Sequence, residues 1–219
     1  MSKKEGGISE IIKNTLALVL ITLVAAVLLG VVYEVTAEPI AQREEQEKQA
    51  AYLKVFPGAA TVQESGEVTG LSVAISRAPE ILGEEYSSAV TVDEACLVRD
   101  EAGGLIGYII TVTDKLGYGG AIQMVFGYAL DGTIKGMEFL KIGETAGFGL
   151  EAEKNPEWRK QFFGVSVPEF KVTKTGAAAN GEIDALSGAT ITSKAVTGGI
   201  NGGLKFARYL SEQEIGGAR

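Results

Sequence analysis

Residues 94–142, EACLVRDEAGGLIGYIITVTDKLGYGGAIQMVFGYALDGTIKGMEFLKI, are the stretch that decides the fold. Runs rich in β-branched and aromatic residues alternate there with glycine loops and with the Asp131-Gly132 turn. This alternation is typical of antiparallel strands joined by tight turns. We therefore predict an antiparallel sheet of about four strands.

Helices are expected to flank this sheet. Residues 57–92 contain scattered Gly and Pro without sustained periodicity, which predicts loops and short strands. Residues 156–163 are typical of a short helix, and residues 193–210 of a longer one, because apolar residues recur on one face. The predicted class is α+β, with one antiparallel-sheet domain and flanking helices.

Composition excludes several functional classes. The 219 residues suffice for one membrane segment and one domain, and the net charge of -8 argues against nucleic-acid binding. One cysteine, Cys96, allows no internal disulfide, and we expect it in the core. The absence of histidine removes serine-hydrolase triads and the usual zinc sites, so no metal site is predicted. Redox chemistry would need a bound organic cofactor.

An uncharged segment near the N-terminus predicts a membrane anchor. Residues 15–33 carry no charge over a length that can cross about 30 Å of hydrocarbon as a helix. We predict a cytoplasmic N-terminus over residues 1–14 and a transmembrane helix over residues 15–36. A cleaved signal peptide is the alternative, since Val35-Thr36-Ala37 resembles a cleavage site, although its apolar core would usually be shorter.

The flanking charges predict the orientation of this anchor. Lysines precede the span and glutamates follow it, at Lys3, Lys4, Lys13, Glu34 and Glu38. The positive-inside rule then places the N-terminus in the cytoplasm and the main domain outside, at the cell membrane. A juxtamembrane helix is expected over residues 37–57, ending at Pro57-Gly58, and the extracytoplasmic domain over residues 58–219.

The candidate site is the stretch DALSGATITS at residues 184–193. It is typical of a small-residue turn entering a helix, with Thr192 or Ser193 as the expected N-cap and Asp184 upstream. Free N–H groups and the positive end of the helix dipole suit a phosphate. The turn leaves space at Gly188 and Ala189, and hydroxyl donors come from Ser187, Thr190, Thr192 and Ser193. Taken alone, these residues leave an ordinary helix cap and a phosphate site both open.

This stretch resembles the flavinylation motif of the FMN-binding domain family, in which the threonine closing S-G-A-T is joined to FMN by a phosphoester bond. The resemblance implies that Thr190 is the attachment residue, with Asp184, Ser187, Gly188 and Ala189 matching the rest of the motif. It also implies a partner, a flavin transferase that uses FAD and magnesium.

Two glycine loops support the resemblance. Residues 143–149, GETAGFG, are similar to the family's E-T-P-G-x-G loop beside the flavin, with Ala146 where proline is usual. Residues 117–122 are similar to its G-Y-x-G-x-I segment. Without the family, both are ordinary structural turns. The resemblance adds four expected cofactor-binding residues, which are Glu144, Thr145, Gly147 and Gly149.

The whole arrangement, with its basic N-terminus, single span, sheet and motif, resembles the family of G subunits of Rnf electron-transport complexes. That implies an electron relay between reduced ferredoxin and NAD coupled to sodium or proton movement, with the other members of the complex as partners and no complete active site on this chain. Three alternatives stay open: the flavin subunit of a sodium-pumping NADH:quinone oxidoreductase, a stand-alone extracellular reductase, and an anchored binding module whose S-G-A-T is a helix cap.

Overall fold

The computed structural model describes the backbone of residues 3–215 and the side chains of residues 9–215. Residues 1, 2 and 216–219 and the side chains of Lys3 and Lys4, on which part of the predicted orientation depends, lie outside that range. The chain divides into two compact units, Met1–Glu47 and Lys48–Arg219.

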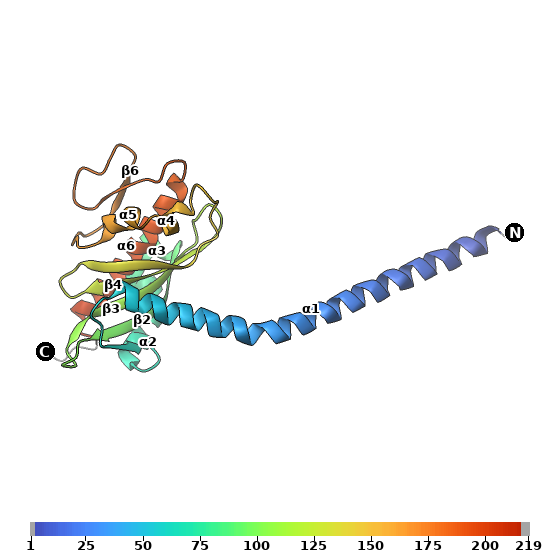
Figure 1. Ribbon diagram of the computed structural model, residues 1–219, viewed down its shortest axis with the longest axis horizontal. Coiled ribbons are helices and arrows are strands. Elements are labelled where there is room, and N and C mark those ends of the chain that lie inside the picture. Colours follow the sequence, from blue (N-terminus) through green and yellow to red (C-terminus); the bar gives the residue numbers. More distant parts are fainter. Residues whose placement is uncertain (1–2, 216–219) are drawn as a thin grey trace. The chain divides into compact units, whose positions relative to one another are not determined.

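One long helix, α1 (Lys3–Val55), contains both the predicted span and the predicted juxtamembrane helix (Figure 1). It is continuous through Pro39, which cannot donate a backbone hydrogen bond. From Ser9 onward the helix is long and apolar enough, by length and composition, to cross a membrane. No break in α1 marks the predicted boundaries at residues 14 and 36, so that division stays a prediction.

The domain is built on a five-stranded antiparallel sheet, in the order β1-β2-β3-β4-β5 (Figure 1). The four predicted strands are confirmed, and β1 adds a short fifth strand at the edge. The strands are β1 (Thr61–Glu64), β2 (Val90–Arg99), β3 (Leu105–Asp114), β4 (Ile122–Ala129) and β5 (Ile134–Lys141).

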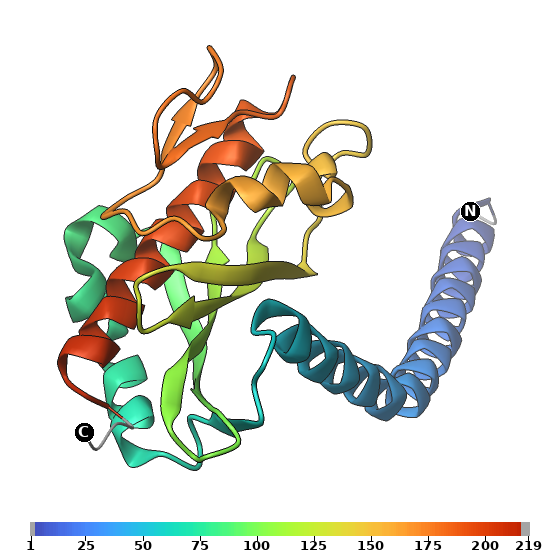
Figure 2. The same ribbon diagram turned by 60° about the vertical axis from the view of Figure 1, so that its left-hand side comes forward.

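One face of the sheet is covered by α6 (Thr190–Glu212), which Figure 2 shows running across it. Glycines bring this helix close, since a Cβ on Gly203 would lie 2.5 Å from the Phe126 ring and one on Gly199 3.0 Å from Met124 Cε. These glycines therefore pack directly against the sheet. The helix extends beyond the predicted 193–210 at both ends.

Two short helices, α2 (Thr69–Ser76) and α3 (Ala78–Ser87), lie where we expected loops and short strands. They were missed because Pro79 and Gly83 interrupt any periodicity, and α3 is non-helical at Gly83. Both helices bury apolar residues in the main core, among them Leu71 and Leu82. Burial in the core, rather than local propensity, accounts for them.

The other face of the sheet packs against the C-terminal end of α1. Tyr52, Val55 and Phe56 are buried there with Cys96, which is fully buried as predicted. Three glycines on neighbouring strands admit this end of the helix, and a Cβ on any of them would lie 2.4–3.0 Å from Val55 or Phe56; they are Gly107, Gly127 and Gly136. Residues 48–56 are therefore part of the domain.

The chain between β5 and α6 forms small elements beside the sheet. The predicted helix over 156–163 is confirmed as α5 (Pro156–Arg159) followed by a 3₁₀ turn, η1 (Lys160–Phe162), and α4 (Glu151–Lys154) precedes it. Two three-residue strands, β6 (Lys171–Thr173) and β7 (Glu182–Asp184), pair in parallel. The fold is α+β.

Candidate functional site

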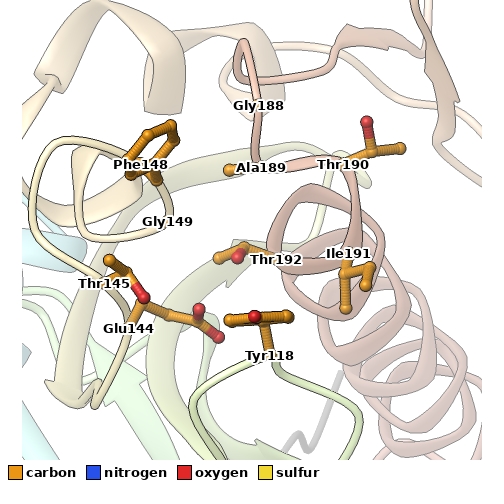
Figure 3. Close-up of a pocket in the computed structure, with 10 residues that line it drawn as sticks. All are labelled: Tyr118, Glu144, Thr145, Phe148, Gly149, Gly188, Ala189, Thr190, Ile191 and Thr192. Carbon is orange, nitrogen blue, oxygen red and sulfur yellow. The ribbon is translucent and has the colours of Figure 1, made fainter.

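A pocket of about 490 Å³ opens at the N-terminal end of α6 (Figure 3). Three segments distant in sequence form it: the β3–β4 loop, the loop between β5 and α4, and the turn before α6. Its lining residues are Tyr118, Glu144, Thr145, Phe148, Gly149, Gly188, Ala189, Thr190, Ile191 and Thr192. The volume lies in the range of small-molecule and cofactor sites.

The first turn of α6 has no side-chain cap. Its N-cap is Ala189, and the helix begins at Thr190, so the predicted N-cap at Thr192 or Ser193 is wrong. Ser193 lies inside the first turn, where its hydroxyl accepts from Leu186 N–H (2.9 Å) and donates to Ala189 C=O (3.0 Å). Ser193 is completely buried, and it closes the turn instead of facing the pocket.

Three backbone N–H groups at this helix end face no protein acceptor within the described range. They belong to Thr190, Ile191 and Thr192, since Ser193 N–H is the first to bond, to Ala189 C=O at 3.0 Å. Unsatisfied N–H groups and the positive end of the dipole of a 23-residue helix attract an anion. The turn therefore has the donor set that a phosphate needs.

The two threonines of this turn differ in exposure. Thr190 is half-buried at the rim, and Figure 3 shows its hydroxyl directed away from the pocket. Thr192 is 1% exposed and lies inside the pocket. Of these two threonines, Thr190 is therefore the one whose hydroxyl another molecule can reach from outside.

Glycine keeps the motif turn close to the neighbouring loop. Gly188 has a φ of +72°, which disfavours any residue with a side chain. A Cβ there would also lie 2.9 Å from the Phe148 ring. The turn therefore needs glycine at this position both for its backbone conformation and for its contact with Phe148.

A buried carboxylate, Glu144, lies at the floor of the pocket. It is 7% exposed, and its Oε1 accepts from Gly119 N–H at 3.2 Å. A Cβ on Gly149 would lie 2.6 Å from Glu144 Oε2 and 2.5 Å from Thr192 Oγ1. Both oxygens thus converge below Gly149, and the pocket combines a polar floor with an apolar rim.

The rim residues were not among the predicted site residues. Tyr118, Phe148 and Ile191 line the pocket with 72%, 52% and 53% of their surfaces exposed. Large exposed apolar side chains around one opening mark a binding surface. For Tyr118 and Phe148 the signal in the sequence was an aromatic residue inside a glycine loop, which is weak because such loops are common; Ile191 gave no such signal.

Four predicted site residues do not line the pocket: Asp184, Ser187, Gly147 and Ser193. Asp184 is instead held through its main chain, because Trp158 Nε1 donates to its C=O and Gln161 Oε1 accepts from its N–H, both at 2.7 Å. Trp158 and Phe162 are themselves buried in the main core.

A second buried acid, Asp114, ends strand β3 at the start of the loop that carries Tyr118. It is 2% exposed, and its Oδ1 accepts from Leu116 N–H at 2.7 Å. Burial raises the pKa of this carboxyl to about 6.

Within the described range no group of three or more Cys, Asp or Glu side chains is placed to hold a metal ion.

Family comparisons match both parts of the chain. A model of the FMN-binding domain matches residues 117–205, which include every residue lining the pocket, and a model of the RnfG N-terminal region matches residues 1–55. The G subunit of the Na(+)-translocating ferredoxin:NAD(+) oxidoreductase complex of Acetobacterium woodii is 33% identical, over 92% of this chain and 94% of that protein. The chain belongs to the Rnf G-subunit family.

Two further relatives differ in how much of this chain they match. The G subunit of the ion-translocating oxidoreductase complex of Methanosarcina acetivorans is 32% identical to this Rnf G-family chain, over 94% of it and 97% of the relative. The C subunit of the Na(+)-translocating NADH-quinone reductase of Vibrio anguillarum is 33% identical, but over only 57% of each protein. The resemblance to the Rnf relatives thus extends over nearly the whole chain, whereas the resemblance to the quinone-reductase relative extends over part of it.

Proposed function

We propose that this Rnf G-family chain is a membrane-anchored flavoprotein subunit that relays electrons through FMN esterified to Thr190, within an ion-translocating ferredoxin:NAD oxidoreductase complex. The observation that carries the proposal is the position of Thr190. Its reachable hydroxyl lies at an uncapped helix N-terminus and beside a pocket within the FMN-binding domain match.

The residues present fit FMN. The N–H groups at the start of α6 would bind the phosphate, as at other helix N-termini. Tyr118, Phe148 and Ile191 offer apolar surface to a flat ring, and Glu144 with Thr192 offers polar groups beneath it. Bound FMN supplies electron-transfer chemistry, while the protein provides attachment, orientation and electrostatics.

Attachment requires a second protein, a flavin transferase that uses FAD and magnesium. In the proposed step the Thr190 oxygen forms a bond to the phosphorus of the FMN half of FAD, and the phosphoanhydride bond breaks. AMP leaves, and the hydroxyl proton is released. The Thr190 hydroxyl lies at the rim and is directed away from the pocket, which supports such a reaction, because the transferase must reach it before the pocket is filled.

The anchor and the complex complete the proposal. Helix α1 would span the membrane with its N-terminus in the cytoplasm and the domain outside. The printed names of its relatives support a place in a complex that moves ions, with the other members of that complex as partners and with ferredoxin and NAD sites elsewhere. The span over residues 15–33 carries no charge, which supports an ion path through other polypeptides of the complex.

The test is the mass of the full chain purified in detergent from its native host. We expect a mass higher by FMN less one water, yellow-green fluorescence in a denaturing gel, and loss of both in Thr190→Ala. The matched control is Thr175→Ala, an exposed threonine outside the pocket. Peptide mapping should place the flavin on Thr190 and not on Thr192. If the native chain has only the mass of its unmodified sequence in cells with active transferase, the flavoprotein proposal fails. The remaining alternative is then an anchored binding module.

Co-purification separates the two flavin-complex alternatives. Membranes solubilised mildly from the native host should yield this chain together with proteins that oxidise reduced ferredoxin and reduce NAD. Recovery with an NADH:quinone reductase would assign the flavin to the other complex while leaving its attachment at Thr190 intact.

A further inference from the structure

The segment that carries Thr190 is held by two side chains from a different part of the chain. Trp158 Nε1 donates to Asp184 C=O, and Asp184 N–H donates to Gln161 Oε1, both at 2.7 Å. The two bonds occupy both backbone groups of one residue, six positions before Thr190. Gln161 Nε2 also donates to Trp158 C=O at 3.1 Å, which links the two holding residues.

The neighbouring strand alone gives this segment little support. Strand β7 has three residues and pairs only with the three-residue β6, and a two-stranded sheet is marginal in water. Beyond it, Ala185 N–H donates to Thr173 C=O at 2.8 Å on the β6 side. Trp158 and Gln161 therefore act on the free edge of β7, where a third strand would otherwise lie.

The holding residues are themselves fixed to the core. Asn155 caps α5 by accepting from the N–H groups of Glu157 and Trp158. Trp158 is 5% exposed and packs edge-on against Phe162, with ring centroids 5.6 Å apart. Arg159 lies 3.5 Å from Glu138 Oε2 on β5, with both side chains mostly buried. The hold on Asp184 is thus anchored to the main sheet.

We propose that Trp158 and Gln161 are positioning residues for flavin attachment, because they fix the start of the segment whose other end presents Thr190. Ser193 fixes that other end through its bonds to Leu186 and Ala189. Between these two fixed points the turn has few alternative conformations. This inference rests on the proposed attachment at Thr190, and neither positioning residue lines the pocket.

The test is the rate at which a flavin transferase, with FAD and magnesium, modifies the full-length chain in detergent. Trp158→Phe removes the donor to Asp184 C=O, and we expect it to lower kcat/KM for the chain by about fivefold, as for one lost hydrogen bond. Gln161→Leu removes the acceptor for Asp184 N–H and also the bond to Trp158 C=O, and should lower kcat/KM by at least as much. The loss should appear in KM, since fewer chains hold the competent conformation, while kcat stays unchanged. Gln161→Glu keeps an acceptor oxygen and should restore most of the rate.

The matched control is Tyr108→Phe. Tyr108 is a buried aromatic whose hydroxyl also donates to backbone carbonyls, but at the other end of α6, to Leu210 (3.3 Å) and Ile215 (3.0 Å). It should lower the melting temperature about as much as Trp158→Phe and leave the rate of attachment unchanged.

Two failures can be told apart. A wild-type chain that takes no flavin at Thr190 refutes the proposed function. A wild-type chain flavinylated at Thr190, with Trp158 and Gln161 variants that react at the wild-type rate or no more slowly than Tyr108→Phe, refutes only the positioning role. Gln161 is partly exposed, so we expect its variants to fold. If Trp158→Phe is unstable, the rates of the Gln161 variants alone test the positioning role.

Discussion

At the scale of single residues, the pocket depends on the absence of a side chain at Gly149. Gly149→Ala would place a methyl group 2.5 Å from Thr192 Oγ1 and 2.6 Å from Glu144 Oε2. We expect destabilisation of about 1–3 kcal/mol, typical of overpacking, together with reduced flavin loading. Thermal melting and in-gel flavin fluorescence measure the two effects.

Gly143→Ala is the matched control for that variant. The nearest atom to its Cβ is Gly119 O at an ordinary 3.5 Å. It should change neither stability nor loading. Equal behaviour of the two variants would show that the floor of the pocket adapts and that Gly149 is not required.

A second prediction at this scale concerns Asp114. Because burial raises its pKa to about 6 from an ordinary 3.8, the folded chain holds a proton that the unfolded chain releases between about pH 4 and 6. The stabilisation of the folded state by this bound proton is complete below about pH 4 and is lost as the pH rises through 6. Asp114→Asn keeps the acceptor for Leu116 N–H and should remove this decline in the free energy of unfolding. The decline amounts to at most about 3 kcal/mol before solvent screening.

The measurement is the free energy of unfolding in urea at several pH values between 4 and 7.5. The difference between wild type and Asp114→Asn should change across that range. Glu101→Gln, on an exposed turn, should leave the wild-type dependence in place. A constant difference between wild type and Asp114→Asn would mean that the Asp114 carboxyl titrates normally in the folded state.

At the scale of elements, the last turns of α1 form one layer of the domain. Tyr52 OH and Lys48 Nζ contact Glu94 Oε2 at 3.0 and 3.1 Å, and Tyr52, Val55 and Phe56 are at most 4% exposed. Burying three such side chains stabilises a fold by about 5–9 kcal/mol, which approaches the whole stability of many domains. We therefore expect the C-terminal end of α1 to be needed for folding.

Truncation tests this role. A soluble chain starting at Gln46 should unfold cooperatively with a clear melting transition, whereas one starting at Gly58 should aggregate or melt without cooperativity, as followed by circular dichroism. If both chains melt at comparable temperatures, the face of the sheet that packs against α1 tolerates solvent. The contacts of α1 then add little to the stability of the domain.

At the scale of the whole molecule, single cysteines can test the proposed membrane span and its orientation. Cys96 is fully buried, so the wild-type chain supplies an unlabelled background. In intact cells a membrane-impermeant maleimide should label Thr175→Cys, in the exposed 174–180 loop, and should label Ser9→Cys only after permeabilisation. The reverse pattern would place the flavin domain in the cytoplasm and contradict the proposed orientation.

The sequence by itself determined the features that depend on neighbouring residues. The apolar run at residues 15–33, the strands within 94–142 and the turn at 184–193 are visible because hydropathy, β-propensity and turn chemistry act locally. The resemblance to the family motif adds the prediction that Thr190 is the attachment residue, and in the structure Thr190 is the first residue of α6.

Only the tertiary structure decided which distant residues meet. It brought Tyr118, Glu144 and Phe148 to the start of α6, and it turned Ser193 inward, where it closes the turn instead of capping the helix. It also made Trp158 and Gln161 hold Asp184. No local pattern encodes these contacts, because they depend on strand register and on where each loop leaves the sheet. The end of α1 joined the domain for the same reason, since glycines on separate strands meet only in the folded sheet.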